Sequence, residues 1–228
     1  FDQAMPPEAL RIRGPVDKAV FLLHPGGATR IETTRAGHGA RPKEEPTGTM
    51  TVLGPDGAVV ASTEFDTDLP YEWASPLPAD APGGLYTVSI HDDMRAIWDV
   101  TAAGCKRVFA AEPPPHLGSP GPVRFYFLVP EGTEAFTASA SGLHDGDVGI
   151  VVYDADGLAQ ASAFGNASGA VPGSRTVTAS VTPAAAQTGA IWSLAAIAYG
   201  DLGLQLEGVP AYLATSPEGW FDPAAVGP

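Results

Sequence analysis

The chain has 228 residues, of which 27 are glycine and 23 are proline, and this content of helix-interrupting residues excludes a mainly helical fold. The hydrophobic share of 44% and the charged share of 17% are those of a folded globular protein rather than a disordered one. The formal net charge of −14 excludes nucleic acid as a partner, and no apolar run reaches the roughly 20 residues that membrane insertion requires.

The first half of the chain alternates short apolar runs with turn signals. Runs at 21–23 and 51–53 are followed by Pro-Gly-Gly and by the Pro-Asp-Gly turn at 55–57. A further run at 84–90 alternates apolar and polar residues, which is typical of a strand with one buried face. These segments are expected to be strands joined by tight turns.

The second half repeats this organisation. Runs at 123–129, 136–140 and 148–153 have the length of strands and are rich in β-branched and aromatic residues, and Asp-Ala-Asp-Gly at 154–157 is a hairpin signal. No segment keeps a helical apolar period over three turns. The sequence therefore predicts an all-β protein made of β-sandwiches of the immunoglobulin-like or jelly-roll-like type.

Three large aromatic side chains are expected in the cores of these sandwiches. Tyr86, Trp98 and Trp192 each alternate in phase with aliphatic neighbours. In a strand, residues two apart lie on the same face, so the three rings point to the buried side.

The two halves also share an internal repeat. Three blocks recur in the same order, with 21–31 matching 127–136, 51–62 matching 151–162, and 77–88 matching 182–194. Each half is therefore interpreted as one copy of the same domain, produced by an internal duplication.

The repeat predicts a first β-sandwich at 1–111 and a second at 123–228 that includes a C-terminal tail. Between them, the segment 112–122 has five prolines in eleven residues and is predicted to be an extended, stiff linker. A Pro/Gly-rich stretch at 39–48 is predicted to be a loop insertion in the first copy.

Several motifs of the second copy resemble a known group of domains. They are Phe-Tyr-Phe-Leu-Val-Pro-Glu-Gly-Thr at 125–133, Val-Tyr-Asp-Ala-Asp-Gly at 152–157, Ile-Trp-Ser-Leu at 191–194, and the closing segment at 206–218. Residues 121–221 resemble the C-terminal β-sandwich accessory modules of secreted bacterial hydrolases, including pre-peptidase C-terminal domains and modules appended to polysaccharide-degrading enzymes. The resemblance implies a secreted, extracellular or cell-surface module that is not catalytic.

The candidate ligand residues are the aromatic side chains that the cores do not require. Tyr71 and Trp73 would share one face of an extended segment, with Glu72 opposite, and could form a platform on which sugar rings stack. The alternative is that they close the end of the sandwich or pack on the other domain. Trp220 is a second candidate, although a tail that docks on the fold or on a neighbouring domain is the more usual explanation for such a residue.

Acidic turns supply candidate metal ligands. Asp145 with Asp147, and Asp154 with Asp156, have the alternate spacing that calcium loops favour, but no glutamate follows at the position an EF-hand needs. A structural calcium ion is therefore one hypothesis, and ordinary turns are the other. No other cofactor is expected.

Nucleophile motifs are missing from the sequence, and the single cysteine, Cys105, lacks a catalytic signature. The leading hypothesis is a secreted, non-catalytic accessory protein that binds polysaccharide or positions a partner catalytic domain. The second is a structural, self-assembling extracellular subunit. The third is an unrecognised hydrolase with its site between the domains, because sandwich glycosidases bring their carboxylates together from distant strands.

Overall fold

The computed structural model describes residues 4, 12–14, 16–36, 47–66, 70–93, 96–111, 116–118, 121–142, 146–165, 175–198 and 201–227. These residues form β-strands almost throughout, and all the strand pairs whose register is recorded are antiparallel. The predicted all-β class is confirmed. Among the helices of this described part, none is long and apolar enough to cross a membrane.

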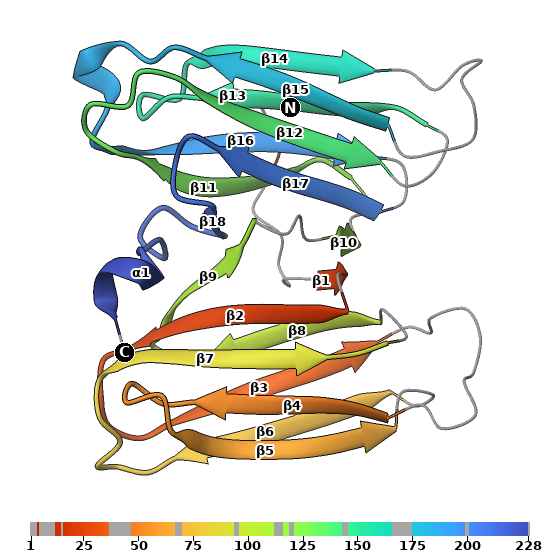
Figure 1. The fold of residues 1–228 in the computed structure, drawn as a ribbon, viewed down its shortest axis with the longest axis vertical. Coiled ribbons are helices and arrows are strands. Elements are labelled where there is room, and N and C mark those ends of the chain that lie inside the picture. The colour runs from red at the N-terminus through yellow and green to blue at the C-terminus, as the bar shows by residue number, and fades with distance from the viewer. Residues whose placement is uncertain are drawn as a thin grey trace. The chain divides into compact units, whose positions relative to one another are not determined.

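The chain divides into two compact units, each built of two facing sheets (Figure 1). We call residues 9–109 with 221–228 the N-terminal unit, and residues 110–220 with the N-terminal residue Ala4 the C-terminal unit.

The strands of the N-terminal unit belong to two sheets, in the orders β1-β8-β3-β6 and β9-β2-β7-β4-β5. Its strands are β1 (Ile12–Gly14), β2 (Asp17–His24), β3 (Thr29–Ala36), β4 (Thr47–Leu53), β5 (Val59–Asp66), β6 (Tyr71–Leu77), β7 (Gly84–His91), β8 (Ile97–Ala102) and β9 (Lys106–Ala110).

The C-terminal unit has the sheets β10-β17-β12-β15 and β18-β11-β16-β13-β14. Its strands are β10 (His116–Gly118), β11 (Val123–Val129), β12 (Phe136–Gly142), β13 (Val148–Tyr153), β14 (Ala159–Gly165), β15 (Arg175–Val181), β16 (Ala190–Ala198), β17 (Asp201–Glu207) and β18 (Tyr212–Ala214). Adding nine to each strand number of the N-terminal unit gives the strand order of the C-terminal unit. The predicted duplication is therefore confirmed at the level of topology.

The duplication extends to the detail of one hairpin. Strands β4 and β5 have a bulge between Val52 and Leu53, and β13 and β14 have one between Val152 and Tyr153. Both hairpins close on a glycine with positive φ, Gly57 at 75° and Gly157 at 79°. A residue with a Cβ is strained in that conformation, which explains why both copies have an Asp-Gly turn.

The core residues follow the predicted alternation. Strand β11 alternates buried and half-buried residues along its length. Tyr86, Trp98 and Trp192 are at most 2% exposed, as their phase predicted. Burying such large rings supplies much of the hydrophobic stabilisation of each sandwich.

The predicted domain limits stay a prediction, but the structure differs from them in two segments. Residues 221–228 group with the N-terminal unit, where Phe221 is buried and the short helix α1 (Pro223–Val226) contacts β7. Within the expected linker 112–122, residues 116–118 form strand β10, which pairs with β17 and buries Leu117. An apolar side chain that can be buried outweighs the local tendency of prolines to form a spacer. Of the predicted insertion 39–48, residues 39–46 lie outside the described residues, and 47–48 begin strand β4.

Candidate functional site

The C-terminal unit has an open groove on the hairpin β13–β14, with a volume of about 460 Å³. It is lined by Val151, Tyr153, Ala159, Gln160, Ala161, Ser162 and Phe164. None of these lining side chains is charged at neutral pH.

Strand alternation places the groove on the outer face of the sheet. Ile150 and Val152 are fully buried in the sandwich core, so the intervening Val151 points the other way. Val151 is opposite Ser162, and Phe164 lies one pair further along the same face. Phe164 is 61% exposed, which is unusual for an aromatic ring on a strand and leaves a flat apolar surface at the groove.

Tyr153 is the buried aromatic residue that lines the groove beside the exposed Phe164 ring. It is 4% exposed, and the Arg124 guanidinium lies 4.3 Å from the centre of its ring, a cation–π contact. Arg124 also donates from Nη1 to Ser193 Oγ at 2.9 Å and from Nε to the Ala4 carbonyl at 3.2 Å. These contacts hold the Tyr153 ring in one orientation.

The turn at the end of the groove is fixed by Asp154. Its Oδ1 accepts hydrogen bonds from the backbone N–H groups of Asp156 and Leu158, both at 2.9 Å. Its Oδ2 accepts from the side-chain amides of Gln160 and Gln187, both at 2.6 Å. The Gln160 side chain is therefore held in place at the rim of the groove.

The equivalent strand of the N-terminal unit, β5, has no aromatic side chain at the positions that correspond to the groove. The repeat places Val60, Ser62 and Glu64 on β5 where β14 has Gln160, Ser162 and Phe164. The groove is therefore a property of one copy. Phe164 was not among the predicted aromatic ligand residues, which were Tyr71, Trp73 and the tail at Trp220-Phe221. The alternation of Gln160, Ser162 and Phe164 with small alanines is the signal that could have revealed it.

The predicted ligand residues on β6 lie in the N-terminal unit. Tyr71 and Trp73 share a face and are half-buried, with Glu72 exposed on the other face, as predicted. That shared face is the one that also buries Leu77, so it points inward. The Tyr71 ring packs 5.2 Å from the ring of Phe65, and its hydroxyl lies 2.9 Å from Thr63 Oγ1.

Trp220, the remaining ligand candidate, is half-buried. Its indole N–H donates to the Tyr212 carbonyl at 3.1 Å, which is the contact of a docked tail. Ligand binding by Tyr71, Glu72, Trp73 and Trp220 stays a prediction.

The candidate metal ligands are not gathered into one cluster in the part of the chain that is described. Among these residues, no three histidine, cysteine, aspartate or glutamate side chains come together as a metal site would need. Asp154 accepts four N–H donors, as above, while Asp156 and Asp147 are exposed. Asp145 lies outside the described residues. Bound calcium stays a prediction.

No protein-family model matches the sequence, and no curated protein matches it. The solved structures that are similar to this chain include two at low identity. One is the N-terminal CBM22-1-CBM22-2 tandem domain of Xyn10C from Paenibacillus barcinonensis, with 9% identity over 81% of this chain and 80% of that chain and a TM-score of 0.22. The other is dimeric latent PorU from Porphyromonas gingivalis, with 11% identity over 87% of this chain and 19% of that chain and a TM-score of 0.28. Neither score is high enough to support a functional argument.

Proposed function

We propose that the chain is a secreted, non-catalytic binding module whose C-terminal unit receives a polysaccharide in the groove on β13–β14. The observation that carries the proposal is the 61% exposed ring of Phe164 beside the polar side chains of Gln160 and Ser162. Sugar rings combine apolar C–H faces with hydroxyl edges, so they need a flat apolar surface next to hydrogen-bonding groups. The resemblance of residues 121–221 to accessory modules of secreted hydrolases supports the same function.

The chemistry of the lining favours binding over hydrolysis. Glycoside hydrolysis needs two carboxyl groups facing the scissile bond, and the seven lining residues in the described part of the chain include none. The nearby Asp154 carboxylate already accepts four hydrogen bonds that hold the turn. The described lining residues carry no charge, which also favours a neutral polysaccharide. In a larger assembly, such binding would position a partner catalytic domain on its substrate.

Affinity electrophoresis against a panel of neutral and acidic polysaccharides tests the proposal. We expect a neutral polysaccharide to retard the wild-type chain. We expect Phe164→Ala to weaken binding about tenfold, which corresponds to about 1.4 kcal/mol for the lost stacking. Leu158→Ala is the matched control, because Leu158 is 62% exposed on the same hairpin but does not line the groove.

Two results would refute the proposed function. One is that no polysaccharide retards the wild-type chain, and the other is that Phe164→Ala and Leu158→Ala bind equally well. Light scattering on the same samples addresses the self-assembly hypothesis, for which a concentration-dependent oligomer that forms without glycan would be the positive result.

A further inference from the structure

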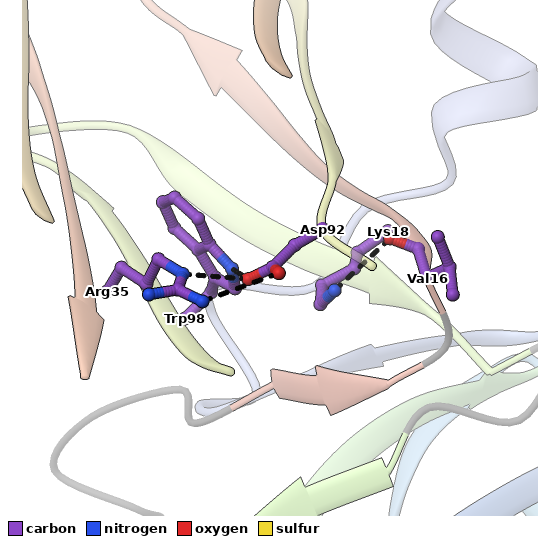
Figure 2. Close-up of polar contacts among 5 residues, drawn as sticks. All are labelled: Val16, Lys18, Arg35, Asp92 and Trp98. Atoms are coloured by element: carbon purple, nitrogen blue, oxygen red, sulfur yellow. Dashed lines mark hydrogen bonds and ion pairs between the residues drawn. The ribbon is translucent and has the colours of Figure 1, made fainter. Parts of the chain in front are cut away.

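A cluster of charged side chains lies inside the N-terminal unit (Figure 2). Arg35 on β3 donates from Nε to Asp92 Oδ2 at 2.9 Å, and the indole N–H of Trp98 on β8 donates to the same oxygen at 2.7 Å. The Arg35 and Asp92 side chains are both 0% exposed. Lys18 on β2 is 6% exposed and donates from Nζ to the Val16 carbonyl at 3.2 Å. We call Lys18, Arg35, Asp92 and Trp98 the buried cluster.

Stability alone does not explain these charges. Burial disfavours the ionised Asp92, but the hydrogen bonds from Arg35 and Trp98 and the charges of Arg35 and Lys18 outweigh that effect and lower its pKa. Well-packed apolar residues often replace a buried ion pair at no cost, whereas removing one partner leaves an uncompensated charge and is strongly destabilising. A strand that packed against the buried cluster without supplying the matching charge would therefore destabilise the core.

The C-terminal unit has apolar residues at the positions that correspond to the buried cluster. Arg35 pairs with Trp98 between β3 and β8, and Ala140 pairs with Leu204 between the equivalent strands β12 and β17. Ala140 is therefore the equivalent of Arg35, and Leu204 is the equivalent of Trp98.

The same reasoning locates the other two members. Lys18 pairs with Ile90 as Val123 pairs with Ala196. Asp92 follows Ile90 by two residues, as Ala198 follows Ala196. All four positions of the buried cluster are thus apolar in the C-terminal unit, where the residues are Val123, Ala140, Ala198 and Leu204.

We propose that the buried cluster prevents the strands of the two copies from exchanging during folding. The copies have the same strand order, so a strand of one copy fits the backbone position of its equivalent in the other, within one chain or between two chains. If β2 or β3 entered the C-terminal unit, Lys18 or Arg35 would lie among apolar residues, and Asp92 would lose a partner. Such an exchanged state is penalised, whereas the correct pairing satisfies the charges.

The test replaces the cluster by the residues of the other copy, in the variant Lys18→Val, Arg35→Ala, Asp92→Ala and Trp98→Leu. The chain is unfolded in urea, refolded over a range of protein concentrations, and analysed by size-exclusion chromatography with light scattering. We expect the variant to give a severalfold larger fraction of dimers that persist on dilution than the wild type gives. A second variant, Lys18→Met, Arg35→Met and Asp92→Leu, keeps the side-chain volume if the first folds poorly.

Glu32→Gln is the control, because it removes the exposed ion pair between Arg30 and Glu32 on β3 of the same unit without changing the cluster. It should refold as the wild type does. If both cluster variants fold and give the wild-type fraction of dimers, the proposal is wrong. If neither variant folds, the cluster is required for the stability of the unit itself, and the proposal is equally wrong.

Discussion

The carboxylate of Asp154 holds the turn between β13 and β14 in place. It is 3% exposed and accepts hydrogen bonds from two backbone and two side-chain N–H groups. The equivalent turn of the N-terminal unit is held differently, since the exposed Asp56 accepts only from Ala58 N in the described contacts, at 3.0 Å.

We therefore expect Asp154→Ala to lower the free energy of unfolding by about 2–3 kcal/mol, because buried N–H groups lose their acceptor. Asp56→Ala should cost less than about 1 kcal/mol. Urea denaturation measures both values. Equal costs would mean that the four hydrogen bonds of Asp154 are not stronger than the one at Asp56.

Thermal melting of the wild-type chain with EDTA and with calcium tests the calcium hypothesis.

The lowered pKa of Asp92 should make the free energy of unfolding of the N-terminal unit depend on pH in the acidic range. Arg35 and Trp98 donate hydrogen bonds to its carboxyl group and the positive charge of Lys18 acts on it, and together they lower its pKa in the folded state against the opposing effect of burial. A group whose folded pKa is lowered contributes stability above its unfolded pKa of about 3.9 and loses it as the pH falls through the folded value.

The wild-type N-terminal unit should therefore lose stability below about pH 4 more steeply than the variant Arg35→Met/Asp92→Leu. Urea denaturation at a series of pH values, followed by tryptophan fluorescence, measures the slopes. Parallel slopes would show that Asp92 does not carry this dependence.

The β6 aromatics give a test of the sequence-based ligand prediction. The Trp73 side chain is on the inward face, so Trp73→Ala should destabilise the N-terminal unit by about 2–4 kcal/mol and leave glycan binding unchanged. Thermal melting and affinity electrophoresis of the same preparation separate the two effects. If a fully folded Trp73→Ala chain no longer bound glycan, the binding site would lie at Tyr71 and Trp73, as the sequence predicted.

At the scale of elements, sequence patterns predict strands well where the alternation is strong. The runs at 123–129 and 148–153 correspond to β11 and β13 with the same bounds, and the Asp-Gly turns lie where they were expected. Strand β10 was missed because its three residues are surrounded by prolines, and only their pairing with β17 reveals the strand.

The functional features were harder to predict for a physical reason. A strand pattern indicates which residues share a face, but it does not indicate which face another segment covers. The outer face of β13 is partly covered, since Ala4 packs with Val151 and Tyr153, while Phe164 on β14 stays exposed. The buried cluster was also missed, because Arg35 and Asp92 are 57 positions apart in sequence and meet only through strand pairing.

At the scale of the whole molecule, the two copies share a topology and differ in what they carry. The C-terminal unit holds the groove with Phe164, and the N-terminal unit holds the buried cluster and the segment 221–228. Duplication supplies two equivalent scaffolds, and substitutions at equivalent positions then make the two units chemically different.

The grouping of residues 221–228 predicts the effect of a truncation. Removing them takes away the buried Phe221 and the helix α1, so the N-terminal unit should lose about 3 kcal/mol or more of stability. Removing only Gly227 and Pro228 is the control and should have little effect. Hydrogen exchange of peptides from each unit locates the change, and equal losses of protection in both units would contradict the assignment.

The most direct test of polysaccharide binding in the groove is hydrogen exchange with and without the glycan that retards the chain most strongly. Binding at the groove predicts added protection in peptides covering 159–165 and none in the equivalent peptides covering 59–66, which serve as the internal control. Protection confined to 71–77, or no protection anywhere, would contradict the assignment of the groove as the binding site.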